Sequence, residues 1–174
     1  MVTTVFAPRV AALRDGRKVR LRALLPSDEQ ELLDAFERLG ANARYMRFMV
    51  AVREPNVERL RAVLSSFPEK GFAIGATVPA PDGIDIVGTA SFMLAPAGKD
   101  CEFAVSVTGD WAGAGLGRVL LEAVIKAARG RGLARMHGFV LARNKPMLKL
   151  AASLGFESTP DPDDRALRIV TLAL

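Results

Sequence analysis

The sequence predicts a domain of mixed α and β structure built around one central sheet. Two observations support this: helix-like and strand-like segments follow one another in mixed order, and half of the 174 residues are hydrophobic. A chain of this length is expected to form one domain that buries about 70% of the surface exposed by the unfolded chain. Three successive strand-like segments joined by short turns predict a mostly antiparallel, mixed sheet flanked by helices.

Residues 1–15 show no clear helix or strand pattern. Residues 1–15 are expected to be a loosely held lead-in that ends at the turn signal Asp15-Gly16, with a single domain over residues 16–174. In Val19–Leu24, apolar and basic residues alternate, which is typical of a half-exposed strand.

Three helices are expected next. Ser27 followed by Gln30 has the spacing of a capping box, so the first helix is expected to begin there and to end at Gly40. A short second helix is predicted over residues 43–49. The third, Asn56–Ser65, places its apolar residues on one face.

The middle of the chain changes to strand-like patterns. Strands are predicted at Phe72–Val78, Ile84–Leu94 and Cys101–Val107, with turns over residues 79–83 and 95–99. These segments form an antiparallel meander. The remaining elements are expected to be a helix at Leu116–Arg129, a strand at Leu133–Leu141, a helix at Lys145–Leu154, and strands at Phe156–Thr159 and Ala166–Leu172.

Charge and cysteine content narrow the class of protein. The net charge is +5, but the basic residues are spread along the chain and form no nucleic-acid-binding arm, so no nucleic-acid partner is expected. No stretch approaches the roughly 18 apolar residues of a membrane span, and no signal peptide is recognisable. Cys101 is the only cysteine, which excludes an intramolecular disulfide. We expect a soluble, cytoplasmic protein without a membrane partner.

A glycine-rich loop carries the strongest functional signal. Gly113, Gly115 and Gly117 lie between a predicted strand and a predicted helix. The first turn of a helix has unpaired N–H groups and the positive end of the helix dipole, so a pyrophosphate can bind there. The spacing matches neither a Rossmann fingerprint nor a Walker phosphate loop. By itself, however, such a loop is also compatible with a simple flexible connection.

Two blocks together resemble the GNAT acetyltransferases. Ala112–Gly117 (AGAGLG) is similar to the family motif Q/R-x-x-G-x-G/A. Asn144 leads a segment that ends in Gly155-Phe156, like a later motif of the family. The resemblance covers about residues 18–174. It is strongest to the acetyltransferase domain of bacterial protein-lysine acetyltransferases, through Glu102–Val105 and Arg44–Phe48.

This resemblance implies a GNAT fold, acetyl-CoA as cosubstrate, and direct transfer of its acetyl group to a primary amine without a metal. A protein lysine is the expected acceptor. The pantetheine arm would pair with the backbone of Val105, Ser106 and Val107. The residues implied to hold the pyrophosphate are Ala112, Gly113, Ala114, Gly115, Leu116, Gly117 and Arg118, and Asn144 is a further cofactor contact that could equally serve as a helix cap.

Glu102 is the candidate general base. A lysine amine has a pKa of about 10.4 and must lose a proton before it attacks a thioester. A carboxylate beside the cleft can accept that proton directly or through water. Glu102 lies on the strand face opposite Cys101 and Phe103, where it could also simply be a solvent-facing glutamate.

Two positions depart from the family pattern and leave alternatives open. Ala112 stands where the family has Gln or Arg, and Ala151 stands where many members have the Tyr that protonates the departing thiolate. The protein could therefore be a small-molecule amine acetyltransferase or a non-catalytic acyl-CoA-binding module. Arg44, Tyr45 and Arg47 either line the acceptor side or form a solvated helix face. The lone histidine, His137, and Cys101 are not expected to take part in catalysis.

Overall fold

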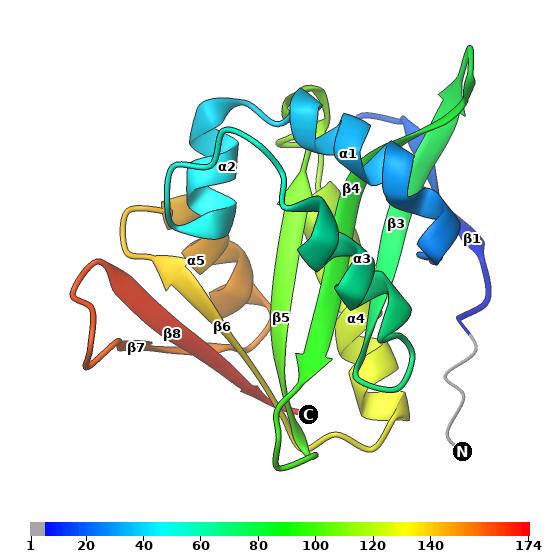
Figure 1. Ribbon diagram of the computed structural model, residues 1–174. Coiled ribbons are helices and arrows are strands. Elements are labelled where there is room, and N and C mark those ends of the chain that lie inside the picture. The colour runs from blue at the N-terminus through cyan, green and yellow to red at the C-terminus, as the bar shows by residue number, and fades with distance from the viewer. Residues whose placement is uncertain (1–5) are drawn as a thin grey trace.

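The computed structural model describes residues 6–174 and contains one eight-stranded sheet in the order β1-β2-β3-β4-β5-β6-β8-β7 (Figure 1). The strands are β1 (Arg9–Ala12), β2 (Lys18–Ala23), β3 (Gly71–Ala80), β4 (Gly83–Leu94), β5 (Asp100–Val107), β6 (Arg135–Leu141), β7 (Glu157–Pro160) and β8 (Leu167–Ala173). Among the described strands, β5 and β6 are the one parallel pair. The prediction of a mixed, mostly antiparallel sheet is confirmed.

Helices cover both faces of the sheet. They are α1 (Glu29–Arg38), α2 (Ala41–Phe48), α3 (Val57–Ser65), α4 (Leu116–Gly130) and α5 (Lys145–Ser153). In Figure 1, α1, α2 and α3 lie in front of the sheet, whereas α4 and α5 lie behind it. The front layer packs a small core that includes Leu24, Leu64 and Ile86, which are all buried. The rear layer packs the larger core.

The rear core is organised by α4. Its apolar residues recur at helical spacing, so Leu116, Leu120 and Val124 face the sheet and are almost completely buried. They pack near Gly88 of β4, where an added Cβ would lie 2.8 Å from the Leu120 side chain. This close approach fixes α4 against the middle strands and thereby fixes the loop that precedes it.

The start of the chain differs from the prediction. Residues 9–12 form the edge strand β1, paired antiparallel with β2, and Ala11 and Leu13 are buried. These residues belong to the sheet and its core, so describing all of residues 1–15 as loosely held was wrong for this part. Residues 1–5 lie outside the described part of the chain.

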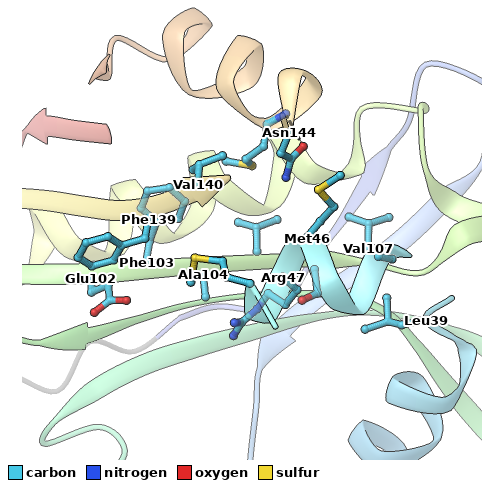
Figure 2. Close-up of a pocket in the computed structure, with 15 residues that line it drawn as sticks. Leu39, Met46, Arg47, Glu102, Phe103, Ala104, Val107, Phe139, Val140 and Asn144 are labelled. Atoms are coloured by element: carbon cyan, nitrogen blue, oxygen red, sulfur yellow. Dashed lines mark hydrogen bonds between the residues drawn. The ribbon is translucent and has the colours of Figure 1, made fainter. Parts of the chain in front are cut away.

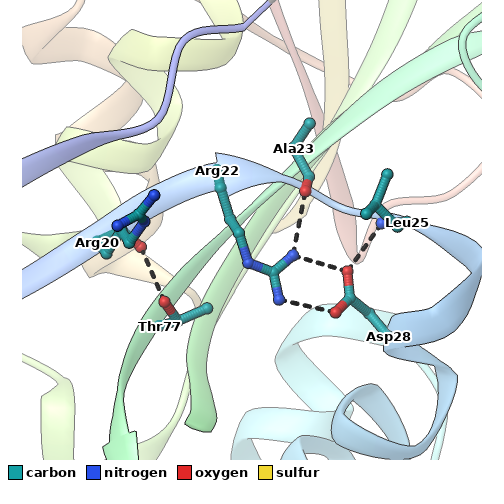
Figure 3. Close-up of polar contacts among 6 residues, drawn as sticks. All are labelled: Arg20, Arg22, Ala23, Leu25, Asp28 and Thr77. Atoms are coloured by element: carbon teal, nitrogen blue, oxygen red, sulfur yellow. Dashed lines mark hydrogen bonds and ion pairs between the residues drawn. The ribbon is translucent and has the colours of Figure 1, made fainter.

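The first helix also begins differently. Ser27 is not its cap: it lies in a short 3-10 helix, Pro26–Asp28, and α1 begins at Glu29. Asp28 instead accepts hydrogen bonds from the Leu25 N–H at 2.8 Å and from both terminal nitrogens of Arg22 at 2.8 and 2.7 Å (Figure 3). This buried carboxylate therefore closes the corner between β2 and α1.

Smaller differences concern the ends of elements. The β3–β4 hairpin turns at Pro81-Asp82, inside the longer turn that was predicted, and α2 begins at Ala41. The α3 prediction is confirmed, with Asn56 as N-cap accepting from the Arg59 N–H at 2.9 Å.

We predict that Asp28→Asn lowers the free energy of unfolding by about 1–3 kcal/mol at neutral pH, because Arg22 loses a charged partner. Burial by itself raises the pKa of Asp28, but the hydrogen bonds from Arg22 and Leu25 outweigh it and hold that pKa below the usual 3.8. The stabilisation is thus present above about pH 4 and lost as the pH falls through the lower pKa of the folded state. Urea unfolding between neutral and acidic pH measures this. An Asp28→Asn deficit that stays constant down to about pH 2 would contradict the account.

Candidate active site

The candidate site lies where β5 and β6 separate. The two strands pair in parallel only over Asp100–Glu102, opposite Arg135–His137. Beyond Glu102 they diverge, and in Figure 1 β6 runs away from β5 with α2 and α5 at the open end. The edge of β5 from Phe103 to Val107 is left without a strand partner on this side among residues 6–174.

An aromatic side chain packs at the branch point. Phe103 follows the last paired residue, and its ring occupies the space beside Gly138 of β6, where an added Cβ would lie 2.5 Å from the ring. The ring also packs on Phe156, with the ring centroids 5.2 Å apart. The Phe103 ring therefore covers Gly138 on one face of the sheet, immediately beyond the last paired residue.

The divergence opens a cavity of about 210 Å³ (Figure 2). It brings together five of the residues that were predicted to act in the site: Glu102, Val105, Ser106, Val107 and Asn144. Arg47, one of the residues that the sequence allowed on the acceptor side, also lines it. The remaining lining residues were not among those site predictions: Leu39, Ala43, Met46, Met49, Phe103, Ala104, Phe139, Val140 and Met147. The sequence marked most of these only as apolar positions, and their convergence follows from the tertiary fold.

The predicted pyrophosphate residues, 112–118, form the loop and first turn of α4 outside the cavity lining. The two regions adjoin, because a Cβ added to Gly117 would lie 3.9 Å from the Val107 side chain and 3.6 Å from Leu150 of α5. An extended ligand can therefore run from the loop along β5. The strand from Val107 back to Glu102 spans about 17 Å.

The loop presents an unusual set of backbone donors. Gly113 and Gly115 have φ of 77° and 88°, a conformation that favours glycine. Gly115 is the N-cap of α4 and has no side chain to cap the helix, and the first helical N–H with a backbone partner is that of Val119, bonded to the Gly115 carbonyl. Between Ala112 and Val119, no backbone N–H donates to a described residue. These donors, with the helix dipole, suit a pyrophosphate.

Two arginines hold the loop through its carbonyl groups. The Arg14 side chain donates to the Gly113 carbonyl at 3.2 Å, and its backbone N–H donates to the Ala114 carbonyl at 3.2 Å. Arg17 donates to the Asp110 carbonyl at 2.9 Å and stacks 4.0 Å from the centre of the Trp111 ring. Because a peptide N–H points opposite to its carbonyl, these contacts orient the loop's N–H groups away from the arginines.

Asn144 has both roles that the sequence left open to it. Its side chain accepts a hydrogen bond from the Met147 N–H at 3.3 Å and so caps α5. It also lines the cavity, where Figure 2 places it at the end nearest α5. The structural role is therefore present, and a cofactor contact remains a prediction.

Cys101 is unsuited to act as a nucleophile, and Ala151 is unsuited to act as a general acid. Burial raises the pKa of the Cys101 thiol to about 11, with Asp100 adding to the shift, so the thiol stays protonated and packs as a core side chain. Ala151 is completely buried, so the position that holds a tyrosine in many GNAT proteins presents an apolar side chain here.

Comparison with known proteins defines the class to which this fold and site belong. A family model described as "Acetyltransferase (GNAT) domain" matches residues 18–157. The chain therefore belongs to the GNAT acetyltransferase family and has its fold. Acetyl-CoA is the cosubstrate of this family, and the open backbone donors and unpaired β5 edge described above fit it.

Individual relatives agree with this assignment. The chain is 31% identical to the acetyltransferase PA5475 of Pseudomonas aeruginosa, over 95% of this chain and 89% of that protein. It is 28% identical to the acetyltransferase Pat of Mycolicibacterium smegmatis over 86% of this chain, but that match spans only 44% of Pat.

Solved structures show the same fold. The GNAT domain of S. lividans PAT superposes with a TM-score of 0.86 at 20% identity, covering 96% of this chain and 97% of that one. The yncA acetyltransferase of Salmonella typhimurium, solved with acetyl-CoA, superposes with a TM-score of 0.68 at 21% identity, covering 90% and 94% of the two chains.

Residues 6–174 contain neither a metal-binding cluster nor a membrane-spanning helix. No group of three or more His, Cys, Asp and Glu side chains in this part of the chain is arranged to hold a metal ion. Its helices also include none with the length and apolar character of a membrane crossing.

We predict that Arg14→Gln weakens acetyl-CoA binding about three- to tenfold, because losing one loop hydrogen bond corresponds to roughly 0.5–1.5 kcal/mol. Calorimetric titration measures the dissociation constant. Arg9→Gln is the matched control, since Arg9 is an exposed arginine of the neighbouring strand β1. Equal affinities of the two variants would show that the contact between Arg14 and the loop does not support binding.

Proposed function

We propose that the protein transfers the acetyl group of acetyl-CoA directly to a primary amine, with Glu102 as general base. The observation that carries this proposal is the position of Glu102 at the branch point of β5 and β6. It is the last residue paired with β6 and lines the cavity that begins there. The free edge of β5 leads from this point toward the α4 loop.

In this mechanism the chain's backbone binds the cosubstrate. The N–H groups of residues 113–118 hold the pyrophosphate, and the edge of β5 at Val105–Val107 pairs with the amides of the pantetheine arm, as an added strand would. The thioester then lies toward Glu102, and Asn144 contacts the arm from the start of α5.

Glu102 accepts a proton from the acceptor's ammonium group, directly or through water. The neutral amine attacks the thioester carbonyl carbon, the new C–N bond forms, and the C–S bond breaks. The nitrogen loses its second proton to water, which leaves the neutral amide. The released CoA thiolate takes its proton from water, because the Ala151 methyl group has no proton to give.

A protein lysine is the acceptor that we favour. Exposed apolar side chains lie in or next to the cavity lining along the chain: Phe139 lines the cavity and is 37% exposed, and Phe48 and Val50, which flank the lining residue Met49 in sequence, are 37% and 59% exposed. Such side chains suit contact with another protein surface. A small-molecule amine is the second candidate, supported by the modest size of the cavity.

We predict that Glu102→Gln lowers kcat about 10²–10⁴-fold while leaving acetyl-CoA affinity nearly unchanged, because the substitution removes the base but keeps the shape of the side chain. CoA release in the presence of a panel of lysine peptides and small amines gives the rate, and calorimetry gives the affinity.

Glu157→Gln is a suitable control, since Glu157 is an exposed strand glutamate of β7. A loss of less than about tenfold in Glu102→Gln would argue against a general base. Lack of CoA release with every amine would overturn the proposed reaction itself.

A further inference from the structure

Arg47 is a charged side chain in the cavity that the proposed reaction does not use. It projects from α2 and lines the cavity together with Glu102 (Figure 2). Within residues 6–174 its guanidinium makes no hydrogen bond and no ion pair. It stacks on the ring of its neighbour Phe48, with the guanidinium carbon 4.8 Å from the ring centre.

The other arginine of α2 behaves differently. Arg44 donates to the carbonyls of Phe36 and Arg53, both at 3.2 Å, and lies 3.6 Å from the Glu37 carboxylate. Arg44 therefore has a structural role that ties α2 to α1 and to the segment after α2. Arg47 has no comparable role, although it lies one turn further along the same helix.

The surroundings of Arg47 are unfavourable for an isolated cation. Burial lowers its pKa, and the positive charge of Arg59 acts in the same direction, whereas Glu102 opposes them. The side chain nevertheless stays protonated, because a guanidinium does not lose its proton in proteins. A desolvated charge without a hydrogen-bonded partner is costly, and an anion that binds beside it removes that cost.

A carboxylate on the acceptor supplies such an anion. Glu102 attracts the ammonium group of the acceptor, and Arg47 can hold a nearby carboxylate through paired hydrogen bonds. An ammonium ion without an accompanying carboxylate would meet the repulsion of Arg47. The two side chains therefore match an acceptor that carries both charges close together.

We propose that Arg47 selects lysine acceptors that have an acidic residue beside them in the polypeptide. This inference rests on the proposed acetylation of lysine and adds its sequence preference. The exposed apolar side chains Phe139, which lines the cavity, and Phe48 and Val50, which flank the lining residue Met49 in sequence, favour a polypeptide over a free amino acid. The positive net charge of the protein also favours an acidic partner surface.

The test uses two capped lysine peptides that are identical except that glutamate flanks the lysine on both sides in one and glutamine in the other. Wild type is expected to give a kcat/KM about tenfold higher with the glutamate peptide, mainly through KM, as a charged hydrogen bond allows. Arg47→Gln is expected to bring this ratio to about one, and Arg47→Lys to retain part of it.

Arg59→Gln is the control, because it removes a nearby exposed arginine outside the cavity lining and is expected to keep the preference. Unchanged acetyl-CoA affinity shows that each variant is folded. If wild type has equal kcat/KM for the two peptides, or if Arg47→Gln keeps the preference, the role of Arg47 is overturned while the proposed reaction stands. Absence of CoA release from any lysine peptide or small amine overturns the proposed reaction and this inference with it.

Discussion

The site depends on the early end of the parallel pairing between β5 and β6, where the Phe103 ring packs beside Gly138. The parallel pairing of β5 and β6 ends immediately before this contact, after Glu102. A longer pairing would use the backbone groups of β5 and close the cavity. Phe103 and Phe156 pack against each other at the branch point and belong to the core, so the separation of the strands is continuous with the packed interior.

In the proposed binding mode, backbone groups hold the cosubstrate more than side chains do. Gly113 and Gly115 have positive φ, and the backbone N–H groups of residues 113–118 have no partner among the described residues. The N-terminus of α4 has no side-chain cap, so the helix dipole also favours an anion there. In this setting the alanine at position 112 removes one side-chain contact but none of the backbone donors. Arg14 and Arg17 bring positive charge to the loop from a distant part of the chain, on the carbonyl side.

Local patterns were sufficient to predict most of the fold. The helical spacing of apolar residues predicted α3 and α4, and the turn residues predicted the meander of β3, β4 and β5. The glycine-rich loop was correctly predicted to precede α4. The strand β1 was missed because its four residues, Arg9–Ala12, are short and lack a clear alternation, and pairing with β2 stabilises them. The prediction that Ser27 caps the first helix was wrong. Asp28 closes this corner through its hydrogen bonds with Arg22, a contact that spacing along the chain cannot reveal.

The sequence anticipated only part of the candidate site. The motif positions on β5 and Asn144 line one cavity, and each follows a recognisable element boundary. Arg47 could be assigned only to a helix that either lines the acceptor side or faces solvent. Its place in the cavity, without a partner among the described residues, follows from how α2 packs against β5, and this information exists only in three dimensions.

The most direct test of the central claim is amide hydrogen exchange with and without saturating acetyl-CoA. The account predicts slower exchange at two places: the N–H groups of residues 113–118 and those on the unpaired edge of β5 between Phe103 and Val107. Exchange in β1, β7 and the distant β3–β4 hairpin is expected to stay unchanged. Binding of acetyl-CoA, established by calorimetry, without protection at either place would contradict the assignment of the cosubstrate to the opening between β5 and β6.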